Sequence, residues 1–230
     1  MGDATDQPGR VPSPLEALEV LASTEVEEAP GLRHLELYTL RGLLTVLWHG
    51  AEGLGAVVAF GGAMGGLLGP GRGLYAELGR RLAEQGVPLL RVSYRRPNDL
   101  DACTLDAAAA VQLAVGSGAE RVVVLGHSFG GAVAVRAGVV LPQFVTGVAT
   151  FATQSAGCEV AGGLQAPLLL FHGERDELLP VFASEAVREM AGHGELVVLP
   201  NDGHLLAKSH DILLERLLEW IPERLAAPGP

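Results

Sequence analysis

The sequence predicts a single α/β domain built on a mostly parallel, doubly wound sheet of about eight strands. First, short apolar segments of strand length alternate with helical segments from residue 56 onward, which is the pattern of strands joined by crossover helices. Second, 230 residues with 48% hydrophobic and 19% charged residues suit one domain with a full core. Third, no uninterrupted apolar run reaches the length of a membrane-spanning helix, so we expect no membrane insertion.

The first 31 residues are expected to form an N-terminal arm with one short helix. Ser13 and Glu16 have the spacing of a capping box, and the leucines at 15, 18 and 21 extend this pattern, so a helix is predicted from Pro14 to Ala22. Residues 25–31 interrupt that pattern. We therefore expect the main domain to begin after them and to span residues 32–225, with residues 226–230 as a loose tail.

Strands and helices of this domain follow from hydrophobic periodicity and from residues that start or stop helices. The first two strands form an antiparallel hairpin joined by Arg41-Gly42. Strands are expected at 33–39, 43–49, 56–60, 88–94, 121–125, 144–151, 167–171 and 195–199. Helices are expected from Leu74 to a stop at Gly86, from a cap at Thr104 to Gly116, from Ser128 to Leu141, at 183–191, and from a cap at Ser209 through Trp220, with Pro222 as its stop.

Charge and cysteine content exclude several classes of function. The formal net charge is −11, and such a surface repels nucleic-acid phosphates and anionic lipid. Cys103 and Cys158 are too few for a disulfide framework, and the N-terminus lacks the basic and apolar blocks of a secretory signal. We therefore expect a cytoplasmic protein that does not bind nucleic acid.

One short motif suggests a catalytic centre. The apolar run at 122–125 leads into Gly126-His127-Ser128-Phe129-Gly130, a G-x-S-x-G pattern at the predicted turn from strand to helix. At such a turn the serine projects from the backbone, and glycines two residues before and after it allow close packing. A simpler interpretation is a tight turn whose serine only caps the helix.

Two loops after later strands could supply partners for Ser128. His204 follows the last predicted strand, and Asp176 follows the strand before it. A serine hydroxyl needs a histidine to accept its proton and a carboxylate to orient the imidazole. The alternatives are a surface histidine and a solvated acid, with Glu174, Glu177 and Asp202 as rival carboxylates; Asp176 is preferred, because Asp202 would have to fold back onto its own loop.

These segments, GHSFGG at 126–131, HGERDELLP at 172–180 and DGH at 202–204, resemble the α/β-hydrolase superfamily. The resemblance runs from Leu35 to Leu225 and is strongest to small lidless serine esterases and the dienelactone-hydrolase-like group. It implies that Ser128 is the nucleophile, His204 the general acid and base, and Asp176 the orienting carboxylate. Dienelactone hydrolases proper use a cysteine nucleophile, so the serine here favours general esterase activity instead.

The glycine-rich loop from Gly61 to Gly73 is expected to form part of an oxyanion hole. In the resembling fold one donor is the amide after the nucleophile, here Phe129, and the second comes from this loop, from either Gly62 or Ala63. The alternatives are a phosphate-binding loop, which lacks the expected lysine and glycine spacing, and a flexible surface turn.

The predicted site is open and partly apolar. Only about fifteen residues separate the strands ending near 151 and starting at 167, too few for a cap domain. The expected pocket residues are Met64, Leu67, Leu68, Leu179 and Leu205. The remaining histidines, including His127 and His172, are interpreted as scaffold, and neither a metal site nor a cofactor is expected.

The function predicted from the sequence is hydrolysis of small carboxylic esters, with a small-molecule ester as the partner. A thioesterase or an acylaminoacyl-type peptidase would use the same three residues, and a non-catalytic binding module on this scaffold is a further alternative. The sequence leaves open whether the protein is a monomer or a homodimer.

Overall fold

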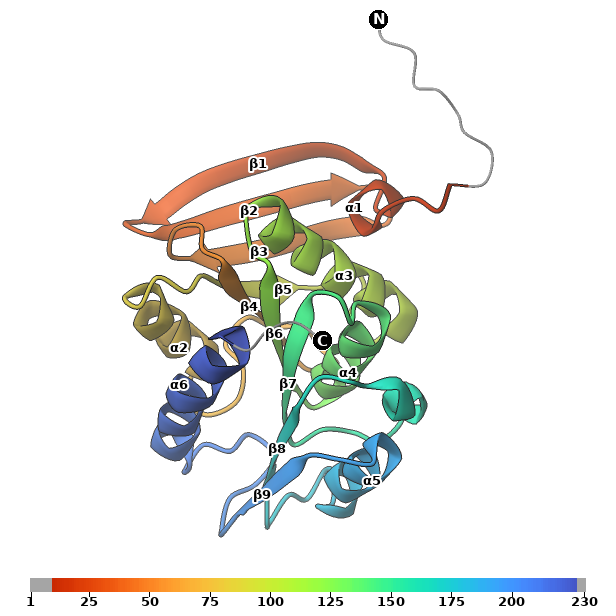
Figure 1. Cartoon of the computed structure of the whole chain (residues 1–230), viewed down its shortest axis with the longest axis vertical. Helices are drawn as coiled ribbons and strands as arrows, with labels where there is room; N and C mark the ends of the chain where they lie inside the picture. The colour runs from red at the N-terminus through yellow and green to blue at the C-terminus, as the bar shows by residue number, and fades with distance from the viewer. Residues whose placement is uncertain (1–9, 227–230) are drawn as a thin grey trace, which may run out of the picture.

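The computed structural model describes residues 10–226, and across these residues nine strands form one mixed sheet. Helices cover both faces of this sheet (Figure 1). The strands are β1 (Val20–Ala29), β2 (Leu32–Thr39), β3 (Gly42–His49), β4 (Gly55–Phe60), β5 (Leu89–Ser93), β6 (Arg121–His127), β7 (Val145–Phe151), β8 (Leu168–Gly173) and β9 (Glu195–Leu199). The helices are α1 (Pro14–Ala17), α2 (Leu74–Ala83), α3 (Leu100–Gly116), α4 (Phe129–Val140), α5 (Phe182–Ala191), α6 (His210–Ala226) and the 3-10 helix η1 (Glu159–Gly163).

The order of strands across the sheet is β1-β2-β3-β5-β4-β6-β7-β8-β9. Strands β1, β2 and β3 are antiparallel to their neighbours, and the pairs from β5 to β9 are parallel. Phe60 pairs with Gly126, and Gly126 with Thr150, so the carboxyl ends of β4, β6 and β7 lie at the same edge. The predicted mostly parallel sheet with an N-terminal antiparallel hairpin is confirmed, with nine strands instead of about eight.

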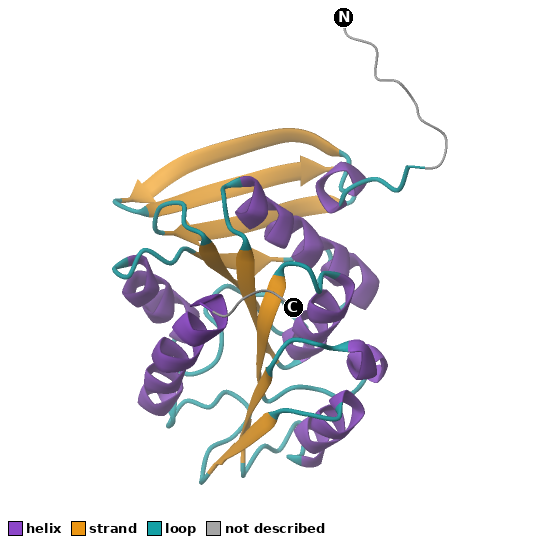
Figure 2. Ribbon diagram, in the orientation of Figure 1, coloured by secondary structure: helices purple, strands orange, loops and turns teal. Residues whose placement is uncertain are grey.

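The parallel strands are apolar throughout because both of their faces are covered. On β6, Val122 and Val124 belong to one hydrophobic cluster, with residues of α3 and α4, whereas Val123 and Leu125 belong to a second, with residues of α2 and α6. All four side chains are fully buried. Figures 1 and 2 show the same division, with α2 and α6 on one side of the sheet and α3, α4 and α5 on the other.

The N-terminal segment differs from the sequence-based prediction. The capping box at Ser13 and Glu16 is present, but the helix expected to reach Ala22 ends at Ala17. Glu19 has a φ of 53°, which turns the chain into the ten-residue strand β1. Leu21, expected on the apolar face of a helix, is 64% exposed. Pairing with β2 stabilises the strand, and local helix-forming signals could not reveal it.

Two helix ends also differ. The N-cap of α3 is Asp99, whose carboxylate accepts a hydrogen bond from the Ala102 amide (3.1 Å), whereas Thr104 lies inside the helix. Helix α6 continues beyond Pro222 to Ala226. Its last turn is held by Leu225, whose carbonyl accepts a hydrogen bond from Arg121 of β6 (3.0 Å). A tertiary contact therefore extends the helix past its proline.

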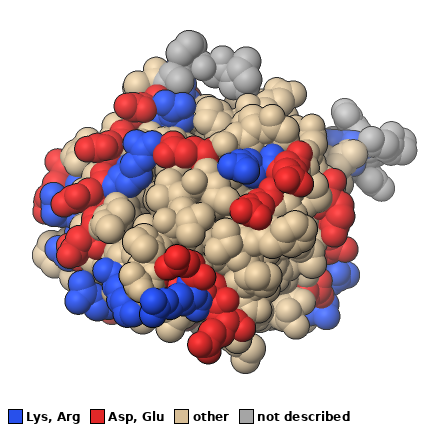
Figure 3. Space-filling model, turned by 90° about the horizontal axis from the view of Figure 1, so that it is seen from below, with Lys and Arg blue, Asp and Glu red and all other residues tan. Residues whose placement is uncertain are grey.

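The described residues between β7 and β8 contain only the 3-10 helix η1, so a cap domain is absent there, as predicted. Of the expected terminal segments, residues 1–9 and 227–230 lie outside the described residues, and the division into arm, domain and tail stays a prediction. Among the described helices, none is long and apolar enough to cross a membrane. On the face shown in Figure 3, acidic and basic side chains are intermingled around uncharged areas.

Candidate active site

The turn between β6 and α4 has the geometry that the G-x-S-x-G motif predicts. Ser128 lies between the two elements with a φ of 57° and a ψ of −117°, a conformation that non-glycine residues rarely adopt. Its amide donates a hydrogen bond to the Phe151 carbonyl of β7 (2.8 Å). A Cβ atom on Gly126 would overlap the Gly130 carbonyl, and one on Gly130 would overlap the Gly61 carbonyl. The two glycines therefore allow the packing that holds Ser128 in this conformation.

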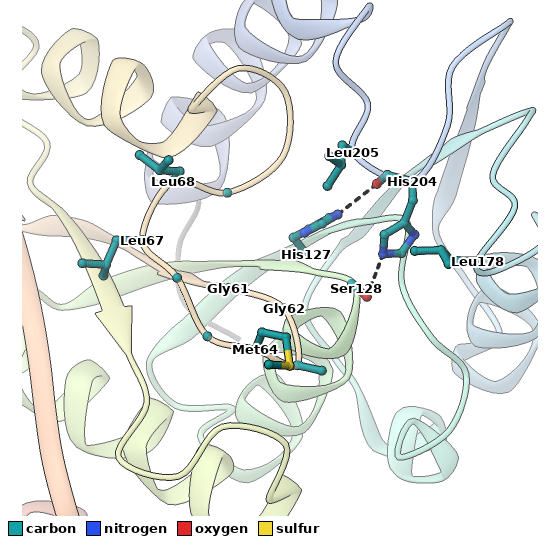
Figure 4. A pocket seen from close by; sticks show the side chains of 14 residues that line it. Gly61, Gly62, Met64, Leu67, Leu68, His127, Ser128, Leu178, His204 and Leu205 are labelled. Carbon is teal, nitrogen blue, oxygen red and sulfur yellow. Dashed lines mark hydrogen bonds between the residues drawn. The ribbon is translucent and has the colours of Figure 1, made fainter.

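The structure brings Ser128, His204 and Asp176 into one chain of hydrogen bonds. Nδ1 of His204 is 2.8 Å from Oδ2 of Asp176. Nε2 of His204 is 3.0 Å from Oγ of Ser128, a contact that Figure 4 shows. An ionised carboxylate only accepts hydrogen bonds, so Nδ1 carries the proton and donates it to Asp176. Nε2 is then the acceptor for the Ser128 hydroxyl, which is the arrangement that a general base requires.

Asp176 is held as a carboxylate by the loop after β8. Its Oδ1 accepts hydrogen bonds from the amides of Leu178 and Leu179, each at 2.9 Å. Burial alone would raise the pKa of this carboxyl, but the Leu179 amide, His204 and the Leu178 amide outweigh that effect and hold its pKa below the usual value. The side chain is fully buried, whereas that of His204 is 14% exposed, so the charge is shielded and the imidazole can reach the pocket.

Two histidines that the sequence analysis interpreted as scaffold contact these residues directly. His172 places Nε2 2.9 Å from the Leu179 carbonyl and 3.2 Å from Oδ2 of Asp176, so its N–H supports the acid loop. His127 donates from Nε2 to the His204 carbonyl (3.0 Å). Burial lowers the pKa of His127 to about 4, so this ring is neutral at pH 7. Their positions in the sequence place His127 beside the turn at Ser128 and His172 beside the acid loop, but the atoms that each ring contacts depend on how the loops fold back.

Two of the rival carboxylates, Asp202 and Glu174, have other partners, and the third, Glu177, is exposed. Asp202 is buried, and its oxygens accept hydrogen bonds from the amides of Gly203 (3.0 Å), Lys208 (3.1 Å) and Ser209 (2.8 Å). It therefore supports the turn that leads into α6. Glu174 accepts a hydrogen bond from the Asn201 amide (3.0 Å). The carboxylate that contacts the His204 ring is Asp176.

The glycine-rich loop after β4 lies beside Ser128. A Cβ atom on Gly62 would be 3.8 Å from the Cβ of Ser128, so the backbone of Gly62 is next to the serine. Phe129 is the first residue of α4, where a backbone N–H has no acceptor within the helix. Ala63 lines the same pocket, but its side chain packs against the core. The backbone of Gly62 therefore adjoins Ser128, and both donors left open by the sequence lie in the loop that lines this pocket.

A pocket of about 460 Å³ opens above these residues (Figure 4). Four of the five predicted pocket residues line it, and these are Met64, Leu67, Leu68 and Leu205. Leu179, whose amide and carbonyl are bound to Asp176 and His172, does not line the pocket, and the 73% exposed Leu178 does. The pocket position that the sequence assigned to Leu179 is therefore taken by the residue one position earlier in the acid loop.

Within residues 10–226, no group of three or more His, Cys, Asp or Glu side chains is placed to hold a metal ion. Cys103 and Cys158 are buried free thiols. Burial raises the pKa of each to about 12, so neither is a thiolate at neutral pH. Among the described residues that line the pocket, the polar side chains are those of Ser128, His204 and His127.

Comparison with known proteins agrees with this architecture. Residues 102–210 match the phospholipase/carboxylesterase family. Similar solved structures include Est1E from Butyrivibrio proteoclasticus, with 16% identity, a TM-score of 0.73, and coverage of 84% of this chain and 99% of that one. Dienelactone hydrolase from Anabaena variabilis has 17% identity and a TM-score of 0.72, covering 87% and 98%.

A third similar structure is an α/β serine hydrolase without a lid from Xanthomonas campestris, with 20% identity, a TM-score of 0.70, and coverage of 87% and 98%. A search of curated proteins finds no sequence relative of this chain. At these identities the solved structures establish the fold. The family match covers residues 102–210, and the solved structures show that this chain has the α/β-hydrolase fold and is similar to hydrolases that lack a lid.

Proposed function

We propose that this protein hydrolyses small carboxylic esters through an acyl-enzyme intermediate. The observation that carries the proposal is the hydrogen-bond chain from Asp176 through His204 to Ser128, at 2.8 Å and 3.0 Å. Ser128 is the nucleophile, His204 the general base and then general acid, and Asp176 holds the imidazole in the required tautomer. The backbone amides of Phe129 and Gly62 bind the oxyanion.

The proposed reaction has two halves. Oγ of Ser128 attacks the ester carbonyl carbon while Nε2 of His204 accepts the hydroxyl proton, and the carbonyl electron pair moves onto oxygen. Collapse of this intermediate breaks the bond to the alcohol, which leaves with the proton from His204. Water then attacks the acyl-enzyme, again losing a proton to His204, and release of the carboxylic acid returns that proton to Ser128.

The pocket favours an uncharged acyl or aryl group as the substrate. Apolar side chains surround Ser128, and Met64, Leu178 and Leu205 are 92%, 73% and 61% exposed. No cap domain in the described chain covers this rim, so alcohols of different sizes can leave freely. We infer that selectivity is for the acyl side and that it declines for charged acyl groups, whose hydration would be lost.

A panel of p-nitrophenyl esters tests the proposal. We expect turnover of short acyl esters by the wild type, and its loss in Ser128→Ala with an unchanged circular dichroism spectrum. Ser117→Ala, at the C-terminal end of α3, is the matched control and should retain activity. A fluorophosphonate probe should label the wild type and Ser117→Ala once per chain and leave Ser128→Ala unlabelled. Full activity in Ser128→Ala would contradict the proposed nucleophile.

The same sample distinguishes the alternatives that share this chemistry. Comparing oxygen-ester, thioester and amide substrates of one acyl group separates an esterase from a thioesterase or an acylaminoacyl-type peptidase. We expect the highest kcat/KM for the oxygen ester. Failure of the fluorophosphonate to label any serine would favour a non-catalytic binding module. The cytoplasmic location and the choice between monomer and homodimer stay predictions.

A further inference from the structure

Tyr94, directly after β5, contacts both sides of the proposed oxyanion hole. Its hydroxyl donates a hydrogen bond to the Gly61 carbonyl (3.2 Å), and Gly61 immediately precedes the proposed donor Gly62. Its ring meets the ring of Phe129, the other proposed donor residue, edge-on, with 6.1 Å between the ring centroids and 86° between the planes. The side chain is 4% exposed, so water does not compete for the hydroxyl.

The hydrogen bond at Gly61 determines the direction of the next amide. The Gly61 carbonyl and the Gly62 N–H belong to one planar trans peptide, in which they point in opposite directions. Two consecutive glycines leave this peptide many conformations, and the bridge between Gly62 and Gly65 restrains it from the loop side. The Tyr94 hydroxyl supplies a second restraint, at the Gly61 carbonyl, and because burial raises the pKa of Tyr94, the hydroxyl keeps the proton that it donates.

We propose that Tyr94 is a positioning residue for the oxyanion hole, aligning the Gly62 amide through the Gly61 carbonyl and the Phe129 amide through ring contact. This inference rests on the proposed esterase function. An oxyanion hole is effective because its donors are oriented before charge develops, so they need no reorganisation in the transition state. Loss of the tyrosine hydroxyl should therefore weaken transition-state binding more than substrate binding.

The chain offers a matched control in Tyr75 of α2. Its hydroxyl donates to the carbonyl of Phe60 (3.1 Å), one peptide before Gly61, and its side chain is fully buried on the opposite face of the sheet. The peptide that it holds carries the Gly61 amide, which is not a proposed donor. Tyr75→Phe and Tyr94→Phe each remove one buried hydroxyl that donates to a carbonyl at the start of the glycine-rich loop, but only Tyr94→Phe frees the carbonyl of the peptide that carries the Gly62 amide.

The test compares both variants with the wild type on the best p-nitrophenyl ester and on a trifluoromethyl ketone with the same acyl group. The ketone reports on the oxyanion hole, because the Ser128 adduct places an oxyanion there. We expect Tyr94→Phe to lower kcat about tenfold with little change in KM, a fraction of the effect of deleting a donor. Inhibition by the ketone should weaken by the same factor, and Tyr75→Phe should change both by less than about twofold. Thermal unfolding of both variants measures their stability.

Phe129→Leu is a second variant, which removes the ring that Tyr94 contacts and keeps the backbone amide. It should weaken ketone inhibition about threefold. If Tyr94→Phe does not fold, Phe129→Leu replaces it as the variant that tests the contact between the two rings. Equal effects of Tyr94→Phe and Tyr75→Phe on ketone affinity would overturn the role of Tyr94 while leaving the esterase proposal intact. A wild type that hydrolyses no ester and forms no ketone adduct would overturn both.

Discussion

The edge strand β1 and the central strands β6 and β7 differ in burial and in chemistry. Every residue of β1 is exposed, and it pairs on one edge only, with β2. All seven residues of β7 are buried, as are six of the seven residues of β6. The residues of the proposed site follow the parallel strands β4, β6, β8 and β9, and the antiparallel strands β1 to β3 contribute none of them.

This difference follows from strand direction. Parallel strands bring their carboxyl ends to one edge, so successive loops converge even though they are far apart in sequence. Ser128 and His204 are 76 residues apart and form a hydrogen bond. Antiparallel strands send alternate loops to opposite edges, so they extend the sheet without concentrating functional groups. The rigid buried strands hold the loops, and the loops carry the reactive groups.

The largest expected effect at the parallel edge comes from Asp176→Asn. An asparagine amide would favour the wrong histidine tautomer, so we expect kcat to fall by about 10³–10⁴-fold while the fold is retained. Asp202→Asn is the matched control, because Asp202 binds backbone amides and not the His204 ring. It should lower the unfolding temperature and reduce kcat by less than about tenfold. Comparable kcat losses in both variants would make the assignment of the acid wrong.

The same substitution in a central strand and in the edge strand tests their difference in stability. Val124 of β6 is fully buried, whereas Val26 of β1 is 51% exposed. We expect Val124→Ala to lower the free energy of unfolding by about 2 kcal/mol, through lost burial and a cavity. Val26→Ala should lower it by less than about 1 kcal/mol. Urea unfolding of both variants, with the midpoint and slope of each curve, measures the two losses of unfolding free energy. Equal losses would indicate that β1 is buried in solution, for example against a second copy.

Two buried histidines, one in an antiparallel strand and one in a parallel strand, predict a loss of stability in mild acid. Burial lowers the pKa of His49 in β3 and of His127 in β6 to about 4. Between pH 6.5 and about 4 the unfolded chain therefore binds more protons at these positions than the folded chain does. The free energy of unfolding thus falls as the pH falls through this range, by about 1–2 kcal/mol for each histidine between pH 7 and 5.

Chemical unfolding at several pH values checks this effect. The pH dependence of the unfolding free energy reports how many protons the chain takes up on unfolding. His49→Gln and His127→Gln should each reduce that number by up to one. Only His127→Gln should also lower kcat, because His127 contacts the His204 carbonyl. A pH profile that neither substitution alters would show that other groups cause the acid sensitivity.

The smallest effect is expected at Arg91 in β5. Its side chain is 6% exposed, burial lowers its pKa, and within residues 10–226 no carboxylate forms an ion pair with it. Its one hydrogen bond is a long one, from Nη1 to the Leu67 carbonyl (3.4 Å). Burying a charge without an ionic partner costs stability, so Arg91→Met should leave the unfolding free energy unchanged or raise it by up to about 1 kcal/mol. A loss above about 2 kcal/mol would indicate a partner for the guanidinium in solution.

Much of the fold and the main residues of the candidate site were predictable from the sequence. The buried strands appear as continuous apolar runs because both of their faces are covered, and this made the order of elements readable. Ser128, Asp176 and His204 could be selected because each follows a predicted strand. Strand β1 was missed, since its residues are exposed and its stability comes from pairing with β2.

Side-chain partners were beyond the reach of the sequence because they depend on how loops fold back in space. The position of the Gly62 backbone beside Ser128, the replacement of Leu179 by Leu178 in the pocket, and the supporting contacts of His127 and Tyr94 all belong to this group. Periodicity and helix signals act over a few residues, so the sequence by itself determined the α/β class and which loops carry the reactive groups. Only the tertiary structure decided which atoms meet, because those contacts join residues far apart in the chain.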